Sequence, residues 1–378
     1  MSNLFCFFYA HYRSDAIRLT TIKSKSKSSS MLNKSFFLFA VIGCLIISLS
    51  ISCKDDNPTV NTPPPVETPK KKVSVPKFDR DTAYQYVAKQ VGFGIRLMET
   101  EGHTKTKAWL TEMFKSFGAE VIQQDFIAET YNGKKYNSTN IIAQYNPAAK
   151  KRILLGAHWD TRHIADSPLA TEKQSEPIMG ADDGGSGVGV LLEIARQIHA
   201  NPIDIGVDIV LFDAEDHGAP RDYEIDDRES MFSWCLGSQH WSKNPHVAGY
   251  RADFGILLDM VGTKNATFTK EGTSMQYAPQ IMNKVWKLAQ GMGYGNYFLD
   301  KRTSALTDDH AFVNAIAGIP MIDIINHNEA NVEGFGESGF GEHWHTHNDD
   351  LDVIDKRTLR AAGQVVLAVI YRADAGKF

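Results

Sequence analysis

Cysteine is scarce in this sequence, and its distribution excludes a disulfide framework. Only four cysteines occur among 378 residues, and three of them, Cys6, Cys44 and Cys53, lie near the N-terminus. We expect Cys6 and Cys44 to be removed and Cys53 to be modified during processing, which leaves Cys235 alone. An intramolecular disulfide in the mature chain is thereby excluded. For Cys235, buried packing is favoured over a reactive thiol.

The sequence also lacks an excess of positive charge. Its formal net charge is -5, with 40 Lys and Arg against 45 Asp and Glu. A nucleic-acid partner calls for a clustered basic face, so we expect none. Hydrophobic residues make up 43% of the chain, which is typical of a globular protein rather than a disordered one. No internal repeat is visible.

A long hydrophobic run is missing as well. The best candidate, residues 36–49, holds about 14 residues, whereas a membrane span needs about 20. This length, directly behind Lys34, is typical of a signal-peptide core. Met31 would supply a normal start for it. We therefore interpret residues 1–30 as an upstream extension and residues 31–52 as a signal peptide.

The end of this run predicts how the chain is anchored. Ser50-Ile51-Ser52-Cys53 resembles a lipoprotein signal, in which the cysteine is lipidated and becomes the first residue. The following Lys54-Asp55-Asp56 resembles the surface-export tag of Bacteroidetes lipoproteins. The resemblance implies a membrane anchor at Cys53 and an outer-membrane protein of the bacterial cell envelope, either surface-exposed or periplasmic. An ordinary cleaved signal peptide is the alternative, and Cys44 is a weaker lipidation candidate.

Beyond the anchor, the composition changes twice. Residues 53–74 are rich in Pro, Thr and Lys without apolar periodicity, which predicts a flexible tether. Residues 75–378 then read as one folded domain, in which helical and strand patterns alternate. Apolar runs predict strands at 120–127, 152–157, 207–212, 254–258 and 321–325. Helical spacing occurs at 79–91, 104–117, 187–199, 279–292, 309–317 and 357–372. This alternation predicts an α/β fold with a largely parallel sheet covered on both faces.

Polar residues follow three of these strands. His158 and Asp160 come after the first of the three, Glu215 and Asp216 after the second, and Asp259 after the third. Parallel sheets bind ligands at the carboxyl ends of their strands, so these side chains are candidates for a site. Adjacent carboxylates are costly at a strand end unless they share a cation or a proton. On a surface loop they would be unremarkable.

Two further segments supply potential metal ligands. The glycine-rich stretch 180–187 contains Asp183, and glycines let the backbone approach a ligand closely. Asp183 could instead simply cap the following helix. The tract 343–350 contains three histidines, a weak metal signal on its own. Together the segments offer carboxylate oxygens and imidazole nitrogens, which suit zinc.

These motifs carry a family resemblance. In order, they are His158-x-Asp160, Gly180-Ala-Asp-Asp183, Phe212-Asp-Ala-Glu215-Asp216, Leu257-Leu-Asp259 and His345-Thr346. Five motifs in this order resemble the zinc aminopeptidases of the M28 clan, over roughly residues 80–375. The resemblance implies a three-layer α/β/α sandwich with a central, mostly parallel mixed sheet and the metal at its carboxyl edge.

Finer features are similar to the animal-type glutaminyl-peptide cyclotransferases of this clan. Trp344 directly precedes His345, and Phe340 stands four residues before Trp344. Two acidic residues, Asp308 and Asp309, precede His310. The stretch 84–96 also looks like the opening helix of these cyclases.

The resemblance implies a role for each matching residue. The implied zinc ligands are Asp183, Asp216 and His345, for one zinc per chain. The implied catalytic residues are Glu215 as general acid/base and Asp259 and Asp308 as carboxylates that share a hydrogen bond. The implied pocket residues are Trp344, Phe340 and Trp234. An insertion at 218–230 disturbs the alignment with the family near Trp234. Asp216 departs from the glutamate of the animal cyclases and is one methylene shorter.

The implied reaction converts the N-terminal glutamine of peptides or proteins to pyroglutamate and releases ammonia. The α-amine is its own nucleophile, so no activated water is needed and one zinc suffices. The main alternative is a two-zinc aminopeptidase that uses His158 and Asp259 as further ligands. We favour a hydrogen-bonded core role for His158. A non-enzymatic binding module is a third reading, disfavoured because every ligand and acid/base position is filled.

Overall fold

A computed structural model describes residues 73–378, and the structural statements below refer to these residues. The predicted upstream extension, signal peptide and lipidation site at Cys53, and residues 53–72 of the tether, lie outside them. Lys70–Phe378 forms one compact unit. No helix in the described part is long and apolar enough to cross a membrane.

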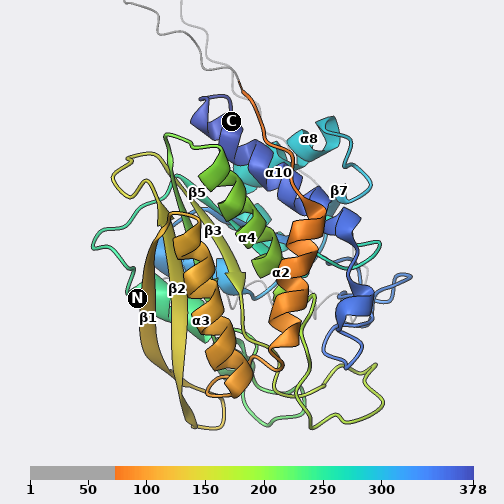
Figure 1. Cartoon of the computed structure of the whole chain (residues 1–378). Coiled ribbons are helices and arrows are strands. Elements are labelled where there is room, and N and C mark those ends of the chain that lie inside the picture. Colours follow the sequence, from red (N-terminus) through yellow and green to blue (C-terminus); the bar gives the residue numbers. More distant parts are fainter. Residues whose placement is uncertain (1–72) are drawn as a thin grey trace, which may run out of the picture. The chain divides into compact units, whose positions relative to one another are not determined.

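A six-stranded mixed sheet forms the centre of this unit (Figure 1). Its strands run in the spatial order β1 (Glu120–Glu129), β2 (Lys135–Tyr145), β4 (Gly206–Phe212), β3 (Arg152–His158), β5 (Phe254–Asp259) and β8 (Met321–Ile325). The four strands from β4 to β8 are parallel, and β2 pairs antiparallel with both β1 and β4. The predicted mostly parallel mixed sheet is therefore confirmed. β2 was not predicted, because its first half is polar.

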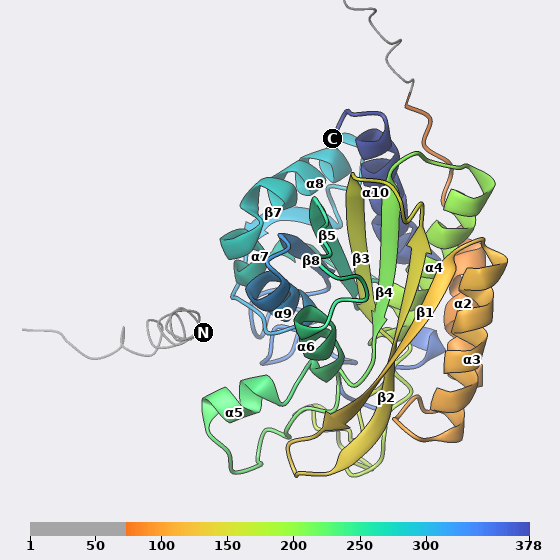
Figure 2. The same cartoon turned by 90° about the vertical axis from the view of Figure 1, so that its left-hand side faces the viewer.

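Helices cover both faces of the sheet, as a three-layer sandwich requires. Figure 2 shows four of them on one side and α6 (Leu236–Lys243) and α9 (Asp309–Phe312) on the other. The four are α2 (Arg80–Gly92), α3 (Glu101–Ser116), α4 (Gly185–Ala200) and α10 (Lys356–Asp374). They lie close to the predicted ranges. The predicted helix 309–317 is instead the short α9 followed by the π-helical turn η1 (Val313–Ala317).

The remaining elements are short or peripheral. They are α5 (Asp227–Phe232), β6 (Phe268–Lys270), α7 (Gly272–Tyr277), α8 (Pro279–Gly291), β7 (Phe298–Arg302) and the 3-10 turn η2 (Leu351–Val353). β6 and β7 pair as a separate two-stranded sheet. α5 begins inside the insertion at 218–230 and ends two residues beyond it.

The strands bury both faces, so each face has its own hydrophobic core. Ile153 and Leu155 of β3 face the larger core beneath α2, α4 and α10, whereas Leu154 faces the smaller one with Trp241 of α6. Burying a side chain of this size stabilises the fold by about 1.5–3 kcal/mol. Helices α2 and α4 approach closely at Gly189, where an added Cβ would lie 2.6 Å from Cγ2 of Val87. This packing fixes the start of α4, where the site begins.

Candidate metal centre and active site

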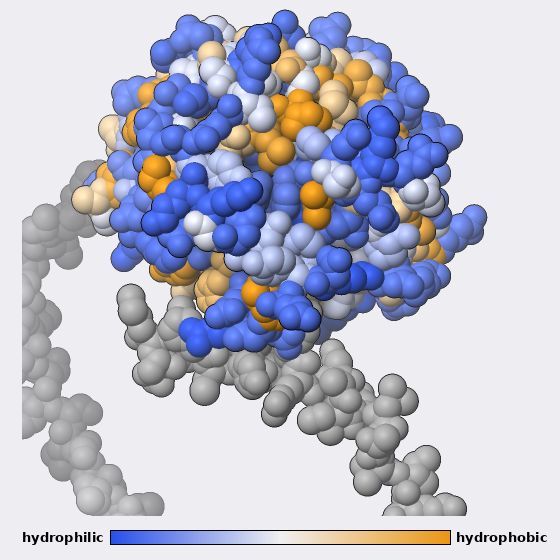
Figure 3. All heavy atoms as spheres, turned by 90° about the horizontal axis from the view of Figure 1, so that it is seen from below, coloured by the Kyte–Doolittle hydropathy of each residue, from blue (hydrophilic) through white to orange (hydrophobic). Residues whose placement is uncertain are grey.

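The candidate site lies at the carboxyl edge of the parallel strands. His158 ends β3, Glu215 and Asp216 follow β4, and Asp259 ends β5. Asp183 precedes α4, and His345 lies on the long connection between β8 and α10. The site face, seen in Figure 3, is mostly hydrophilic with separate apolar patches. The structure thus brings together segments that are up to 187 positions apart (345 minus 158).

Asp183, Asp216 and His345 form the first ligand group. One ligand atom from each lies within 4.8 Å of the others, and all three residues are buried. Nε2 of His345 is 3.2 Å from Oδ1 of Asp216 and 3.8 Å from Oδ2 of Asp183. Atoms bound to one tetrahedral zinc lie about 3.3 Å apart, given bonds of about 2.0 Å. The spacing of the group therefore fits zinc.

Asp216 supplies an independent sign that a cation belongs here. Its Oδ2 is buried and has no hydrogen-bond partner, which is costly for a carboxylate. Burial, together with the negative charge of Asp183, raises the pKa of Asp216 to about 6. A divalent cation would satisfy the unpaired oxygen and favour the ionised form.

The ring of His345 is oriented by a buried ion pair. Nδ1 of His345 lies 2.8 Å from Oδ1 of Asp166, whose carboxylate also accepts from Nε and Nη2 of Arg162 at 3.1 and 2.6 Å. An acceptor at Nδ1 turns Nε2 towards the ligand group, as in metal-bound histidines generally. Burial lowers the pKa of His345, but Asp216 and Asp166 outweigh it and raise the pKa to about 9. Metal binding at Nε2 must therefore displace a proton.

The backbone of Asp183 is held just as firmly. The carboxylate of Asp349 accepts from the amides of Asp182 and Asp183 at 2.8 and 3.1 Å. The buried guanidinium of Arg96 donates to three carbonyls, including that of Gly180. Helix α4 is capped at Gly184 with no side-chain cap bond, so the alternative that Asp183 serves as the cap is wrong. Its carboxylate is left for the site.

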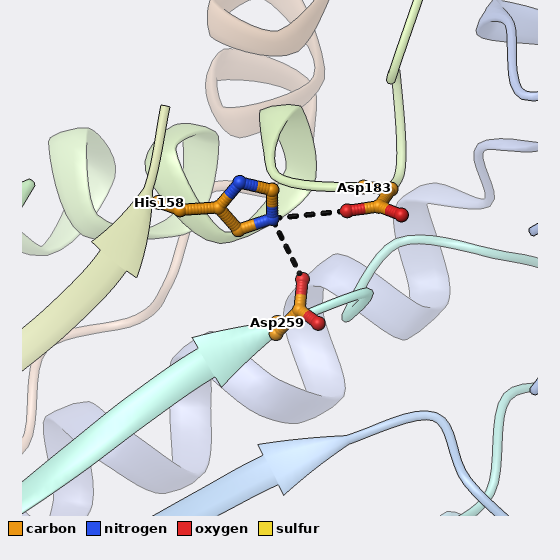
Figure 4. Close-up of side chains that lie close together, drawn as sticks. All are labelled: His158, Asp183 and Asp259. Carbon is orange, nitrogen blue, oxygen red and sulfur yellow. Dashed lines mark hydrogen bonds and ion pairs between the residues drawn. The ribbon is translucent and has the colours of Figure 1, made fainter. Parts of the chain in front are cut away.

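His158, Asp183 and Asp259 form a second ligand group that shares Asp183 (Figure 4). Nε2 of His158 lies 3.0 Å from Oδ1 of Asp183 and 3.2 Å from Oδ1 of Asp259, both hydrogen-bond distances. Its Nδ1 is buried without a hydrogen-bond partner. The nearest carboxylate is that of Asp160, whose Oδ1 lies 3.5 Å from Nδ1 and which accepts from the amides of Glu215 and Asp216 at 3.1 Å each. His158 is thus a hydrogen-bonded core histidine that lacks the orienting acceptor of His345.

The predicted catalytic carboxylates gather beside these groups. Burial raises the pKa of Glu215 well above its usual range, and burial also raises the pKa of Asp259 to about 8. Oδ1 of Asp308 accepts from the amide of Asp309, and Oδ2 is buried without a partner. The hydrogen bond expected between Asp259 and Asp308 stays a prediction.

The three predicted pocket aromatics surround His345. The ring of Trp344 stacks on that of His345 with centroids 3.7 Å apart, and Phe340 lies 4.9 Å from Trp344. Trp234 lies nearly parallel to His345 at 6.0 Å, with Arg162 over its ring at 4.3 Å. All three aromatics are half-buried, so they form an apolar wall that substrate can reach.

Several residues that shape the site escaped the sequence analysis. Asp166 and Arg162 lie on a loop without periodicity, so no local signal marks them. Asp349 lies within the histidine tract, and its position could have suggested a role. Of the other histidines in that tract, His343 pairs with Asp182, and His347 donates to the carbonyl of Lys173.

A three-layer α/β/α fold with a carboxylate–imidazole group at the sheet's carboxyl edge defines a metal-dependent peptidase-like enzyme. The model of Peptidase family M28 matches residues 140–370. The match covers more than half of the sequence, so the chain belongs to peptidase family M28.

Within that family, the chain groups with the glutaminyl cyclases. It is 49% identical to the Bacteroides thetaiotaomicron glutaminyl cyclase bound to N-acetylhistamine, over 79% of this chain and 99% of that one, with a TM-score of 0.75. It is also 47% identical to Tannerella forsythia glutaminyl cyclase, over 78% of this chain and 99% of that one, at a TM-score of 0.74.

Two further relatives qualify this grouping. A Zn-dependent exopeptidase from Parabacteroides distasonis is 49% identical over 79% of this chain and 99% of that one, also at a TM-score of 0.75. Overall identity thus does not separate the two activities. The glutaminyl-peptide cyclotransferase of Bothrops jararaca is 23% identical over 58% of this chain. The chain spans 61% of the length of that relative, less than two thirds.

Proposed function

We propose that the chain is a glutaminyl-peptide cyclotransferase that acts on peptides or proteins with N-terminal glutamine and holds one zinc. The single observation that carries this proposal is the unequal environment of the two histidines. Nδ1 of His345 is hydrogen-bonded to a carboxylate 2.8 Å away, whereas the carboxylate nearest Nδ1 of His158, that of Asp160, lies 3.5 Å away and forms no hydrogen bond with it. Nε2 of His158 contacts two carboxylates at hydrogen-bond distance. The arrangement supports one complete metal site beside an acid/base residue.

The reaction closes a five-membered lactam. A bond forms between the α-amine nitrogen and the side-chain amide carbon, and the bond from that carbon to the amide nitrogen breaks. Zinc held by Asp183, Asp216 and His345 would polarise the amide oxygen and stabilise its developing negative charge. Glu215 accepts the proton of the attacking amine and delivers it to the departing ammonia.

The aromatic wall and the substrate itself explain why one metal suffices. Intramolecular attack supplies a high effective molarity, so no metal-activated water is required. Trp344, Phe340 and Trp234 bind the substrate beside His345 and exclude competing water. Hydrolysis would instead call for an activated water, which two-metal sites commonly provide.

The second candidate function is a two-zinc aminopeptidase. Asp183 faces both ligand groups, and a relative of equal identity is called an exopeptidase. This reading would require His158 to exchange its carboxylate contacts for a metal.

One experiment separates the two functions. The purified chain is assayed with a Gln-peptide and a Leu-peptide, and its zinc content is measured. We expect cyclisation of the Gln-peptide with one tightly bound zinc per chain. Leu-peptide hydrolysis that depends on two tightly held zincs would establish the aminopeptidase instead.

We further propose that the enzyme is an outer-membrane lipoprotein anchored at Cys53. Support comes from Ser50-Ile51-Ser52-Cys53 and the Lys54-Asp55-Asp56 that follows it. Cys53→Ala should release the protein from the membrane fraction, and unchanged membrane association would refute the anchor. Protease treatment of intact cells then distinguishes surface from periplasmic display.

A further inference from the structure

Cys235 occupies an unusual position beside the acid/base residue. It directly precedes α6 with φ of 56°, in the left-handed region that non-glycine residues rarely adopt. Its amide donates to the carbonyl of Glu215 at 2.9 Å, and the next amide, of Leu236, donates to the carbonyl of Ala214 at 3.0 Å. Ala214 is left-handed too, with φ of 55°. Two strained segments are thus held against each other at Glu215.

The side chain of Cys235 extends this contact. Its Sγ is fully buried and lies 3.2 Å from Oε1 of Glu215. The thiol donates to this oxygen. Burial raises the pKa of the Cys235 thiol well above its usual range, and the Glu215 carboxylate adds to the rise. The sulfur therefore keeps its proton and stays a donor.

A second observation places this thiol inside the catalytic cluster. Ligand atoms of Glu215, Cys235 and Asp308 lie within 4.8 Å of one another. Oδ2 of Asp308 is buried and has no hydrogen-bond partner, so the cluster presents an unsatisfied acceptor beside the sulfur. Helix α6 also packs closely against the end of β4, since an added Cβ at Gly237 would clash with the backbone of Asp213.

We propose that Cys235 is a positioning residue: its thiol holds Oε1 of Glu215, and so fixes the orientation in which the other oxygen meets the α-amine of the substrate. This inference rests on the proposed role of Glu215 in cyclisation. The burial predicted from the sequence is confirmed, and the proposal adds a role to it, because packing alone requires no donor aimed at a carboxylate. The thiol itself forms no bond to the substrate.

The test compares Cys235→Ala and Cys235→Ser in the full chain, with kcat, KM and zinc content measured on a Gln-peptide. Cys235→Ala should lower kcat about tenfold, the usual effect of losing a hydrogen bond to a charged group, while KM and zinc stay unchanged. Cys235→Ser should restore most of kcat, because a hydroxyl also donates. Ser242→Ala is the matched control: Ser242 is buried on the same helix, its Oγ has no partner, and its removal should leave kcat unchanged.

A double-mutant cycle completes the test. If Cys235 acts through Glu215, then Cys235→Ala should add little to the loss caused by Glu215→Gln. The proposal is overturned if Ser is as slow as Ala, if the loss appears in KM alone, or if Cys235→Ala costs the same factor in both backgrounds. Cyclisation by the wild type tests the proposed function separately. If the wild type hydrolysed the Leu-peptide instead, the same comparisons on that reaction would decide the role of Cys235.

Discussion

The two ligand groups that share Asp183 differ mainly in what lies behind the histidine. His345 is backed by Asp166, which is itself held by Arg162, so its free nitrogen faces the group. His158 faces the same aspartate, yet its far nitrogen has no hydrogen-bond partner. The same residue types at similar distances therefore need not have the same function. The residues behind the two histidines are what distinguish the group that we propose holds the metal.

The largest expected effect comes from removing each histidine in turn. His345→Ala should lose tight zinc and nearly all turnover, because it removes a ligand of the complete group. The affinity loss should exceed the roughly 10–100-fold caused by changing a residue that only orients a ligand. His158→Ala, the matched variant, should retain one zinc. Zinc content is measured by elemental analysis after dialysis. Equal zinc loss in both variants would show that the two ligand groups do not differ in metal binding.

The next effect separates the adjacent carboxylates. Glu215→Gln should keep zinc while turnover falls by ~10²–10⁴, the usual contribution of a positioned general acid/base. Asp216→Ala should weaken zinc binding, with partial recovery of activity in excess zinc. Zinc occupancy and Gln-peptide cyclisation are measured on both. If Glu215→Gln lost its zinc while Asp216→Ala kept it, the two assignments would be reversed.

A smaller effect tests the acceptor behind His345. Asp166→Asn keeps the shape of the side chain but weakens its hold on Nδ1 and on Arg162. Zinc affinity should fall about 10–100-fold. Asp160→Asn, which alters the carboxylate nearest Nδ1 of His158, should change zinc affinity less. Competition with a chelator gives both values, and the reverse order would contradict the comparison.

The smallest expected effect concerns acid stability near the aromatic wall, away from both groups. His327 lies 5.3 Å from Phe340 between ring centroids, and burial lowers its pKa to about 4. The unfolded value is about 6.5, so the stability present above pH 6.5 is lost as pH falls towards 4, by about 2–3 kcal/mol. His327→Gln should flatten the free energy of unfolding over this window. The free energy of unfolding is measured by urea titration at pH 7 and at pH 4.5. If it falls by the same amount in the wild type and in His327→Gln, the acid sensitivity belongs to other groups.

The strand ends could be predicted from the sequence because strand pattern and polar residues lie next to each other there. His158 and Asp259 were located in this way. Asp183 and the histidine tract were noted as potential ligands from their composition, and the resemblance to known motifs then singled out Asp183 and His345. β2 escaped because its first half is polar, although its residues from 138 to 145 are buried. Asp166 escaped because its partner lies 179 positions away, a contact that no local pattern records. The cysteine, expected only to pack, proved to contact Glu215.

The separation of 179 positions between Asp166 and His345 also has a kinetic consequence. Contacts between residues this distant in sequence form late in folding. The chain loses entropy when it closes so long a loop, and this loss precedes the stabilisation that the contact provides. The group around Asp183 can exist only once β3, β4, β5 and β8 have paired in register. Zinc uptake during refolding should therefore lag behind the recovery of secondary structure, and bound zinc should slow the opening of the loops around His345.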